Sequence, residues 1–274
     1  MKMDCRLLAA DIDRTLVNEK KELMPLTRRM LEELHQEGVL LCIASGRPIE
    51  NQLVKRHEEW GLSFQFDLII GMNGGELHDF RNNTHHEYHK LKKESIHEII
   101  DMMEPLNLNC FVYRNGFMLC RRMDQATKES SIRNHEPAIA AEKVEDLYQE
   151  DNAKLLFRLA SPDMMPAALS YAEAHPSPDY IAFQTGPRVL EFQDPRVSKG
   201  TALEEYCKAN GIPRENVAAF GDTTNDNTMI QFAGMGVAMK NSTEDTLSVA
   251  KAITEYDAEH DGVGHYIQDH ILGK

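Results

Sequence analysis

The sequence predicts an α/β protein with a Rossmann-like, doubly wound parallel sheet and an inserted α+β domain. Short, unbroken apolar runs alternate with helical patterns near both ends of the chain, which is typical of a parallel sheet covered by helices on both faces. Between these two stretches, hairpin-like and mixed segments replace the alternation. We therefore predict a discontinuous core domain of residues 1–80 and 196–274, interrupted by an inserted domain of residues 81–195.

The first part of the predicted core contains three short strands joined by helices. Each apolar run is too brief for a helix and ends abruptly in polar residues. The strands are Leu7–Ala10, Val39–Ala44 and Asp67–Ile70. Pro25 is placed to open a helix that Gly38 closes, and Pro48 opens the next one.

The inserted region carries its own apolar segments, and an acidic patch at 142–151 separates its two halves. We expect hairpin-like segments at Glu76–Tyr88 and Asn109–Arg121, helices at Lys93–Met103 and Pro166–Ala174, and strands at Leu155–Leu159 and Val189–Phe192. Such a block is large enough to form a separate α+β domain.

The alternation of strands and helices resumes after the insertion. We predict strands at Asn216–Phe220 and Gly236–Met239, and helices at Ser198–Gly211, Met229–Phe232, Thr243–Ala250 and Asp261–Ile271. The return of the pattern indicates that both ends of the chain build one sheet.

The composition excludes several classes of partner. Acidic residues outnumber basic ones by 44 to 30, and the formal net charge of −14 disfavours nucleic acid and anionic membrane surfaces. No apolar run approaches the roughly eighteen residues of a membrane span, and the first one meets Asp11 too soon for a signal peptide. The five cysteines lack CxxC spacing, which favours a reducing cytoplasm over a disulfide framework.

Polar side chains gather where the predicted core strands end and in the loops beside them. They are Asp11, Asp13, Thr15, Ser45, Arg47, Asn73, Lys199, Asp222, Asn225 and Asp226. Because the carboxyl ends of parallel strands meet at one edge of a sheet, we expect these residues to share a rim. Two carboxylates as close as Asp11 and Asp13 repel unless a cation lies between them or one holds a proton. The pair therefore indicates a divalent metal such as Mg²⁺, acid–base chemistry or nucleophilic attack.

Each of these residues also has a simpler structural interpretation. Lys199 fits a surface lysine at a helix start, and Arg47 fits a solvated loop charge. Asn73 between glycines fits a tight turn with positive φ, and Asp226 fits a helix N-cap. The three histidines within 85–89 lack metal-ligand spacing, and we expect them to be exposed.

Four segments in order along the chain resemble the motifs of the haloacid-dehalogenase-like phosphatases. They are Asp11–Leu16 (DxDxT), Ala44–Arg47, Lys199–Gly200 and Gly221–Asp226 (GDxxND). Asn73–Gly75, Gly236–Asn241 and Asp261–Val263 are similar to features of the Cof-like subfamily (type IIB), whose members carry an α/β cap after the third core strand. The resemblance implies that the inserted domain is this cap.

The resemblance implies catalytic roles for four residues. Asp11 would be the nucleophile that receives the phosphoryl group, and Asp13 would protonate the leaving oxygen and then deprotonate the hydrolytic water. Ser45 would donate a hydrogen bond to a phosphoryl oxygen, whose charge Lys199 would offset.

The resemblance also implies a metal site and substrate contacts. The metal residues would be Asp11, Asp13 through its carbonyl, Asp222 and Asp226, and the cofactor Mg²⁺. The substrate-binding residues would be Thr15, Arg47, Asn73 and Asn225, with Asn225 and Asp226 also holding Lys199 or a metal-bound water. One residue departs from the pattern: Arg14 stands where the subfamily usually has glycine, and we expect it to reach toward the cap or the substrate.

Together these observations predict a Mg²⁺-dependent cytoplasmic phosphatase that hydrolyses a small phosphorylated metabolite, such as a sugar phosphate or a phosphorylated cofactor, through an aspartyl-phosphate. A phosphomutase or phosphotransferase using the same intermediate is one alternative, and a non-catalytic metabolite-binding regulator is another. The cap side chains would set the substrate, and no sequence feature argues for a particular oligomeric state.

Overall fold

The computed structural model describes residues 4–133 and 136–274, which divide into two compact units. The first unit comprises the described residues up to Ile49, together with Leu53–His86 and Ser198–Lys274. The second comprises Glu50–Gln52 and the described part of Glu87–Val197. No helix among the described residues is long and apolar enough to cross a membrane.

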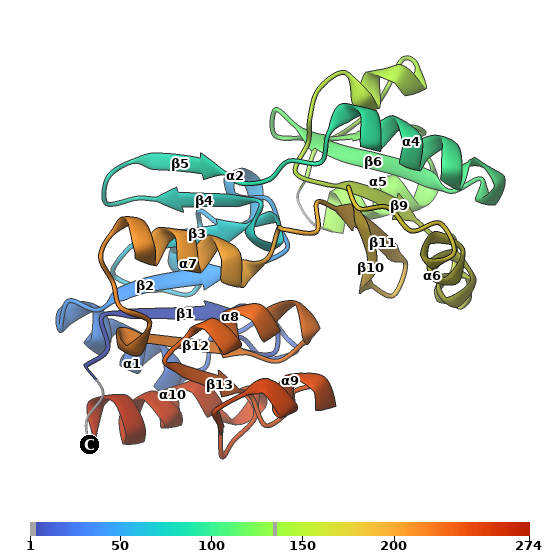
Figure 1. Cartoon of the computed structure of the whole chain (residues 1–274). Helices are drawn as coiled ribbons and strands as arrows, with labels where there is room; N and C mark the ends of the chain where they lie inside the picture. The colour runs from blue at the N-terminus through green and yellow to red at the C-terminus, as the bar shows by residue number, and fades with distance from the viewer. Residues whose placement is uncertain (1–3, 134–135) are drawn as a thin grey trace. The chain divides into compact units, whose positions relative to one another are not determined.

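The first unit contains an eight-stranded sheet with the order β14-β13-β12-β1-β2-β3-β4-β5 (Figure 1). Its strands are β1 (Leu7–Asp11), β2 (Leu40–Ala44), β3 (Leu68–Gly71), β4 (Glu76–Asp79), β5 (Thr84–Glu87), β12 (Val217–Gly221), β13 (Met235–Ala238) and β14 (Ala252–Ile253). From β14 to β3 every neighbouring pair is parallel. The predicted α/β fold with a parallel core sheet is confirmed.

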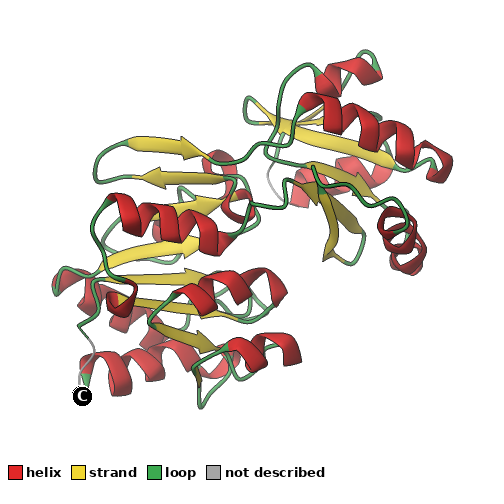
Figure 2. Ribbon diagram, viewed as in Figure 1, coloured by secondary structure: helices red, strands yellow, loops and turns green. Residues whose placement is uncertain are grey.

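Helices cover both faces of this sheet, as Figure 2 shows. They are α1 (Pro25–Gln36), α3 (Arg56–Glu59), α7 (Lys199–Ala209), α8 (Asn227–Phe232), α9 (Glu244–Val249) and α10 (Gly262–Tyr266), which continues as a π-helix over Ile267–Leu272. The short helix α2 (Ile49–Gln52) begins in the first unit and belongs mostly to the second. Strand β1 is buried along its whole length because its side chains alternate between two covered faces. Leu8 and Ala10 join the cluster that α1 and α10 complete, while Leu7 and Ala9 are buried outside that cluster.

The β4–β5 hairpin belongs to the first unit's sheet, although the sequence suggested that the inserted domain begins at residue 81. Strand β4 pairs antiparallel with β3, and β5 forms the sheet edge beyond it. All four residues of β5 are exposed, so the strand lacks the apolar run by which the other core strands are recognised. His85 and His86 lie on this edge strand and, like His89, are exposed as expected.

The second unit contains a six-stranded, mostly antiparallel sheet with the order β10-β11-β9-β6-β7-β8. Its elements are α4 (Lys93–Met103), β6 (Asn109–Arg114), β7 (Phe117–Cys120), α5 (Gln125–Arg133), β8 (Ala138–Ala140), β9 (Leu155–Arg158), α6 (Met165–Glu173), β10 (Ile181–Gly186) and β11 (Val189–Gln193). Residues of α4 and α6 share one apolar cluster with the sheet. We predicted α4, α6 and four of the strands, but not α5, β8 or β10.

The missed elements lack a strong apolar period. The buried face of α5 is made by Thr127 and Ser130 rather than by large apolar residues. Strand β8 has only three residues, and β10 is an edge strand without a buried residue. Such segments gain their structure from neighbouring strands and helices, which a local pattern does not reveal.

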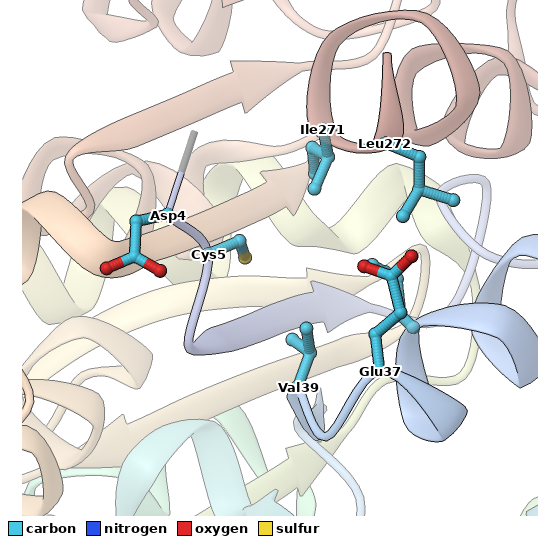
Figure 3. Close-up of a pocket in the computed structure, with 7 residues that line it drawn as sticks. Asp4, Cys5, Glu37, Val39, Ile271 and Leu272 are labelled. Carbon is cyan, nitrogen blue, oxygen red and sulfur yellow. The ribbon is translucent and has the colours of Figure 1, made fainter. Parts of the chain in front are cut away.

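The strand order places a topological switch point between β1 and β12. The chain proceeds from β1 to β2 and β3 on one side, and from β12 to β13 and β14 on the other. In open α/β sheets ligands bind outside the carboxyl ends of the strands at such a point. A pocket at the opposite, amino end of β1 and β2 (Figure 3) is lined by Asp4, Cys5, Leu34, Glu37, Val39, Ile271 and Leu272, none of which the motifs include.

Candidate active site

Three carboxylates meet at the switch point. Asp11 ends β1, Asp222 follows β12, and Asp226 closes a 3-10 turn that starts at Thr224. Because β1 and β12 are parallel neighbours with Ala10 opposite Phe220, the two strands deliver Asp11 and Asp222 to the same end of the sheet. One oxygen atom from each of the three aspartates lies within 4.8 Å of the others, and all three residues are buried.

Lys199 completes the cluster from the first turn of α7. Its Nζ lies 2.6 Å from Oδ1 of Asp11 and 2.6 Å from Oδ1 of Asp226. The residue is 0% exposed, which rules out the surface lysine that its position at a helix start also allowed. Ser198 caps this helix by accepting a hydrogen bond from the Thr201 amide, as N-cap serines do.

The approach of α7 depends on Gly200. A Cβ atom at this position would lie 2.4 Å from the backbone carbonyl carbon of Thr228, much closer than real side chains come. The Gly200 amide also donates to the Thr228 hydroxyl over 3.1 Å. The lysine–glycine pair therefore places the ammonium group and lets its helix pack against α8.

Asp226 already has partners for both carboxylate oxygens. Oδ2 accepts hydrogen bonds from the amides of Asp222 and Thr223, at 3.0 Å and 3.2 Å, and Oδ1 contacts Lys199. Asp226 occupies the N-cap position of α8, as the sequence allowed, but its side chain makes no cap hydrogen bond there and instead closes a capping box with Thr223. Asp226 thus fixes both the loop after β12 and the lysine, while Oδ2 of Asp222 is buried without a hydrogen-bond partner among the described residues.

Burial shifts the protonation of this cluster. Desolvation raises the pKa of Asp11 to about 7, against the opposing effect of Lys199. Desolvation, assisted by the negative charge of Asp226, likewise raises the pKa of Asp222 to about 7. The pKa of Lys199 lies above its usual range because Asp11 and Asp226 outweigh the effect of its burial. Lys199 is therefore positively charged. The positive charge around Asp11 and Asp222 is too small to keep the pKa values of their carboxyl groups in the ordinary range.

The donor set fits a hard divalent cation. Three carboxylates face one ammonium group, Asp222 keeps a buried oxygen without a hydrogen-bond partner in the described part of the chain, and all donor atoms are oxygen. Mg²⁺ binds through one or two protein carboxylates together with water and substrate phosphate. Asp11 and Asp222 have the geometry to supply those carboxylates, whereas Asp226 is committed to Lys199 and two amides.

Asp13 lies beside the cluster and carries its own cations. Its carboxylate pairs with the Arg47 guanidinium on Oδ2 and with Lys21 Nζ at 2.6 Å on Oδ1. Burial favours a higher pKa for Asp13, but Arg47 and Lys21 together hold that pKa below its ordinary value. Arg47, for which the sequence allowed a solvated loop charge or a phosphate-binding group, is an ion-pair partner of Asp13 in this structure, and its contact with phosphate stays a prediction.

The remaining predicted residues lie in the neighbouring loops. Asn73 has φ +57°, as its place between glycines suggested, and its backbone N–H donates to the Ser45 carbonyl over 3.0 Å. Its side-chain Oδ1 accepts from Asn225 Nδ2 over 3.2 Å. The Ser45 hydroxyl accepts a hydrogen bond from the Arg47 amide, and Thr15 has a buried hydroxyl without a partner among the described residues.

Two further residues at the site make contacts that the motifs did not predict. Lys21, which none of the motifs contains, reaches Asp13, and only its closeness in sequence gives a signal for this contact. The Arg14 guanidinium turns to Asp222 Oδ2, at 3.8 Å from Nε, and to the Asn241 carbonyl. Both contacts lie within the first unit, and the reach of Arg14 toward the cap or the substrate stays a prediction.

Comparisons with known proteins agree with this geometry. Residues 8–267 match the model of a family described as haloacid dehalogenase-like hydrolase. The chain is 25% identical, over 97% of each chain, to 5-amino-6-(5-phospho-D-ribitylamino)uracil phosphatase YitU of Bacillus subtilis. It is 25% identical to the pyridoxal phosphate phosphatase YbhA of Escherichia coli, over 98% of this chain and 100% of that one. A solved subclass IIB sugar phosphatase, BT4131, shares the fold with a TM-score of 0.79 at 21% identity, over 96% and 98% of the chains.

The buried position of Lys199 predicts a large effect on stability. Lys199→Met leaves two buried carboxylates without their shared cation, and we expect a loss of about 3–5 kcal/mol in the free energy of unfolding. Lys208→Met on the same helix removes an exposed lysine and serves as the control, with little expected change. Urea unfolding at pH 7 measures both, and equal stability of the two variants would contradict the buried ion pairs.

The raised pKa values predict how metal-free protein responds to pH. Asp11 and Asp222 hold protons up to about pH 7 in the folded protein but only to about 3.8 in the unfolded chain. The folded state therefore binds more protons between these values, so the free energy of unfolding falls as pH rises from about 4 to 7. Denaturant titrations without metal test this expectation.

Asp222→Asn is the matched variant, because it removes one of the two titrating groups and keeps the shape. Its stability should fall less steeply over the same pH range, and added Mg²⁺ should stabilise the wild type more than the variant above pH 7. Identical slopes for the two proteins would refute the assignment.

Proposed function

The chain belongs to the haloacid dehalogenase-like hydrolases and is a phosphoric monoester hydrolase; from this premise we propose that it is a Mg²⁺-dependent phosphatase of small phosphorylated metabolites. The observation that carries the proposal is the buried contact between Lys199 and Asp11 beside Asp222. A carboxylate held next to a fixed cation, at the carboxyl ends of parallel strands, suits nucleophilic attack on a phosphorus atom.

In the proposed first step Asp11 attacks the phosphorus atom of the substrate. A bond forms between its carboxylate oxygen and phosphorus, and the bond from phosphorus to the ester oxygen breaks. Lys199 neutralises charge on the phosphoryl oxygens, and its contact with Asp226 keeps the ammonium group in place. Mg²⁺, when bound by Asp11 and Asp222, would supply further positive charge and keep both carboxylates ionised.

Asp13 would protonate the departing ester oxygen. Its carboxylate is paired with Arg47 and Lys21, and the resulting low pKa keeps it ionised before substrate arrives. A dianionic phosphoryl group competes with Asp13 for Arg47, because phosphate and carboxylate bind guanidinium in the same way. Loss of that partner raises the pKa of Asp13 and lets it carry the proton. After proton transfer the Asp13 carboxylate is the base that activates water against the aspartyl-phosphate.

The proposed substrate is a small-molecule phosphate ester. Two relatives that align over nearly their whole length are named for such compounds, a phosphorylated ribitylaminouracil and pyridoxal phosphate. The fold supports many substrates, and the individual metabolite follows from side chains outside the catalytic cluster.

The nucleophile assignment predicts that Asp11→Asn loses at least about 10³-fold in kcat on every phosphate monoester that the wild type hydrolyses. Phosphate release from a panel of sugar phosphates, nucleotides and phosphorylated cofactors with Mg²⁺ measures this. Asp67→Asn is the control, because Asp67 is a half-buried carboxylate of the same sheet that accepts the Leu41 amide away from the site.

The same panel separates the alternatives. Equal phosphate release by wild type and Asp11→Asn would refute the nucleophile. An isomerised or transferred phosphoryl group without free phosphate would identify a phosphomutase or phosphotransferase. Metal-independent binding without turnover would identify a regulator.

The pairing of Asp13 with two cations predicts a shift in the pH profile. Lys21→Met removes one of them and raises the pKa of Asp13, so more of the acid form survives at high pH. The alkaline limb of kcat, which reports the enzyme–substrate complex in which Asp13 carries the proton, should therefore move to higher pH. Lys20→Met removes an exposed neighbouring charge and should leave the limb in place. A shift of equal size in both variants would point to net charge rather than to Asp13.

A further inference from the structure

Arg14 occupies a backbone conformation that arginine rarely adopts. Its φ is +60°, in the left-handed region that favours glycine, in the turn that directly follows Asp13. Side chains are found in this region when the surroundings hold them there, and such positions concentrate at functional sites. The residue therefore calls for a reason beyond the shape of the turn.

Asn241 holds Arg14 through two hydrogen bonds. The Arg14 carbonyl accepts from Asn241 Nδ2 over 2.9 Å, and Arg14 Nη2 donates to the Asn241 carbonyl over 3.3 Å. The Asn241 side chain also accepts from the Ala258 amide over 3.1 Å, which ties the pair to the loop before α10. These hydrogen bonds fix the turn and the direction of the Arg14 side chain.

The guanidinium points to the carboxylate oxygen that lacks a hydrogen-bond partner. Arg14 Nε lies 3.8 Å from Oδ2 of Asp222, and this oxygen is buried without such a partner among the described residues. The Asp222 side chain is 3% exposed, whereas the Arg14 side chain is 50% exposed. At this distance the half-exposed guanidinium is held weakly by the buried oxygen, and another cation can take its place beside Asp222.

We infer that Arg14 is a built-in competitor of the divalent cation for Asp222. This inference rests on the proposed function, because it concerns the metal of that site. With Arg14 near Asp222, part of the negative charge is compensated before metal arrives. Binding of Mg²⁺ then requires the guanidinium to move toward solvent, and its residual charge repels the ion. Arg14 thereby weakens metal affinity and lets the acidic cluster stay assembled at low Mg²⁺.

The test measures metal affinity directly. Calorimetric titration with Mg²⁺ and with Mn²⁺ compares wild type, Arg14→Gln and Arg14→Lys. We expect Arg14→Gln to bind both ions about three- to tenfold more tightly, since one half-exposed positive charge near the ion is removed. Arg14→Lys keeps the charge and should stay within about twofold of the wild type. Thermal stabilisation by Mg²⁺ should also be larger in Arg14→Gln, by an increment that follows the logarithm of the same factor.

Three comparisons make the result specific. Arg6→Gln removes an exposed arginine that donates to the Gly211 carbonyl and controls for net charge. Arg14→Gly relieves the positive φ and should raise the melting temperature without metal, whereas Arg14→Gln leaves the φ unfavourable, so that charge and strain are separated. Asp222→Asn should weaken metal binding at least about tenfold.

Unchanged or weaker metal affinity in Arg14→Gln, with Asp222→Asn still impaired, would overturn the role of Arg14 and leave the metal site standing. An equal gain in Arg6→Gln would also overturn it, since net charge would then suffice. Metal binding that Asp222→Asn does not impair would overturn the proposed metal site itself, and with it this inference.

Discussion

The site depends on one buried interaction, the ammonium group of Lys199 between Asp11 and Asp226. Lys199 lies 188 residues from Asp11 and 27 residues from Asp226 along the chain, and its Nζ is 2.6 Å from an oxygen of each. Removing an ammonium group from water is costly, so the lysine stays buried only because both carboxylates compensate its charge. Such an arrangement adds little to stability compared with apolar packing. Under the proposed function its value lies in holding the Asp11 carboxylate beside a fixed positive charge.

The fold supplies this arrangement through strand ends that cannot move independently. β1 and β12 are parallel neighbours in the middle of the sheet, so their ladder hydrogen bonds hold together the strand ends that carry Asp11 and precede Asp222. Helix α7 brings Lys199 close because Gly200 has no side chain to meet Thr228. Asp226 binds the amides of its own loop and the lysine at once. The charged groups are therefore in position before a substrate arrives, which is the main requirement of phosphoryl-transfer catalysis.

The sequence predicted most of what local pattern determines. Buried strands such as β1 read as apolar runs, and the residues at their ends could be assigned to one rim because parallel strands share a direction. The hairpin at Glu76–Tyr88 was expected in the inserted domain, whereas its exposed strand β5 forms the edge of the first unit's sheet, and the polar helix α5, whose order comes from its neighbours, was not predicted. The partners of Asp13 and Arg14 were also out of reach, since the direction of a long side chain depends on contacts made after folding. Hence the sequence identified the acids and the lysine, while the structure identified the ion pairs that set their protonation.

The central claim is that Asp11 accepts a phosphoryl group next to a metal ion shared with Asp222. The most direct measurement is a crystal structure of the protein with Mg²⁺ and beryllium fluoride, which mimics a phosphoryl group on a carboxylate. We expect beryllium to be bonded to an Asp11 oxygen, Lys199 to lie within hydrogen-bond distance of a fluoride, and Mg²⁺ to be ligated by Asp11 and Asp222. Beryllium fluoride bound to another residue, or Mg²⁺ ligated without Asp222, would contradict it.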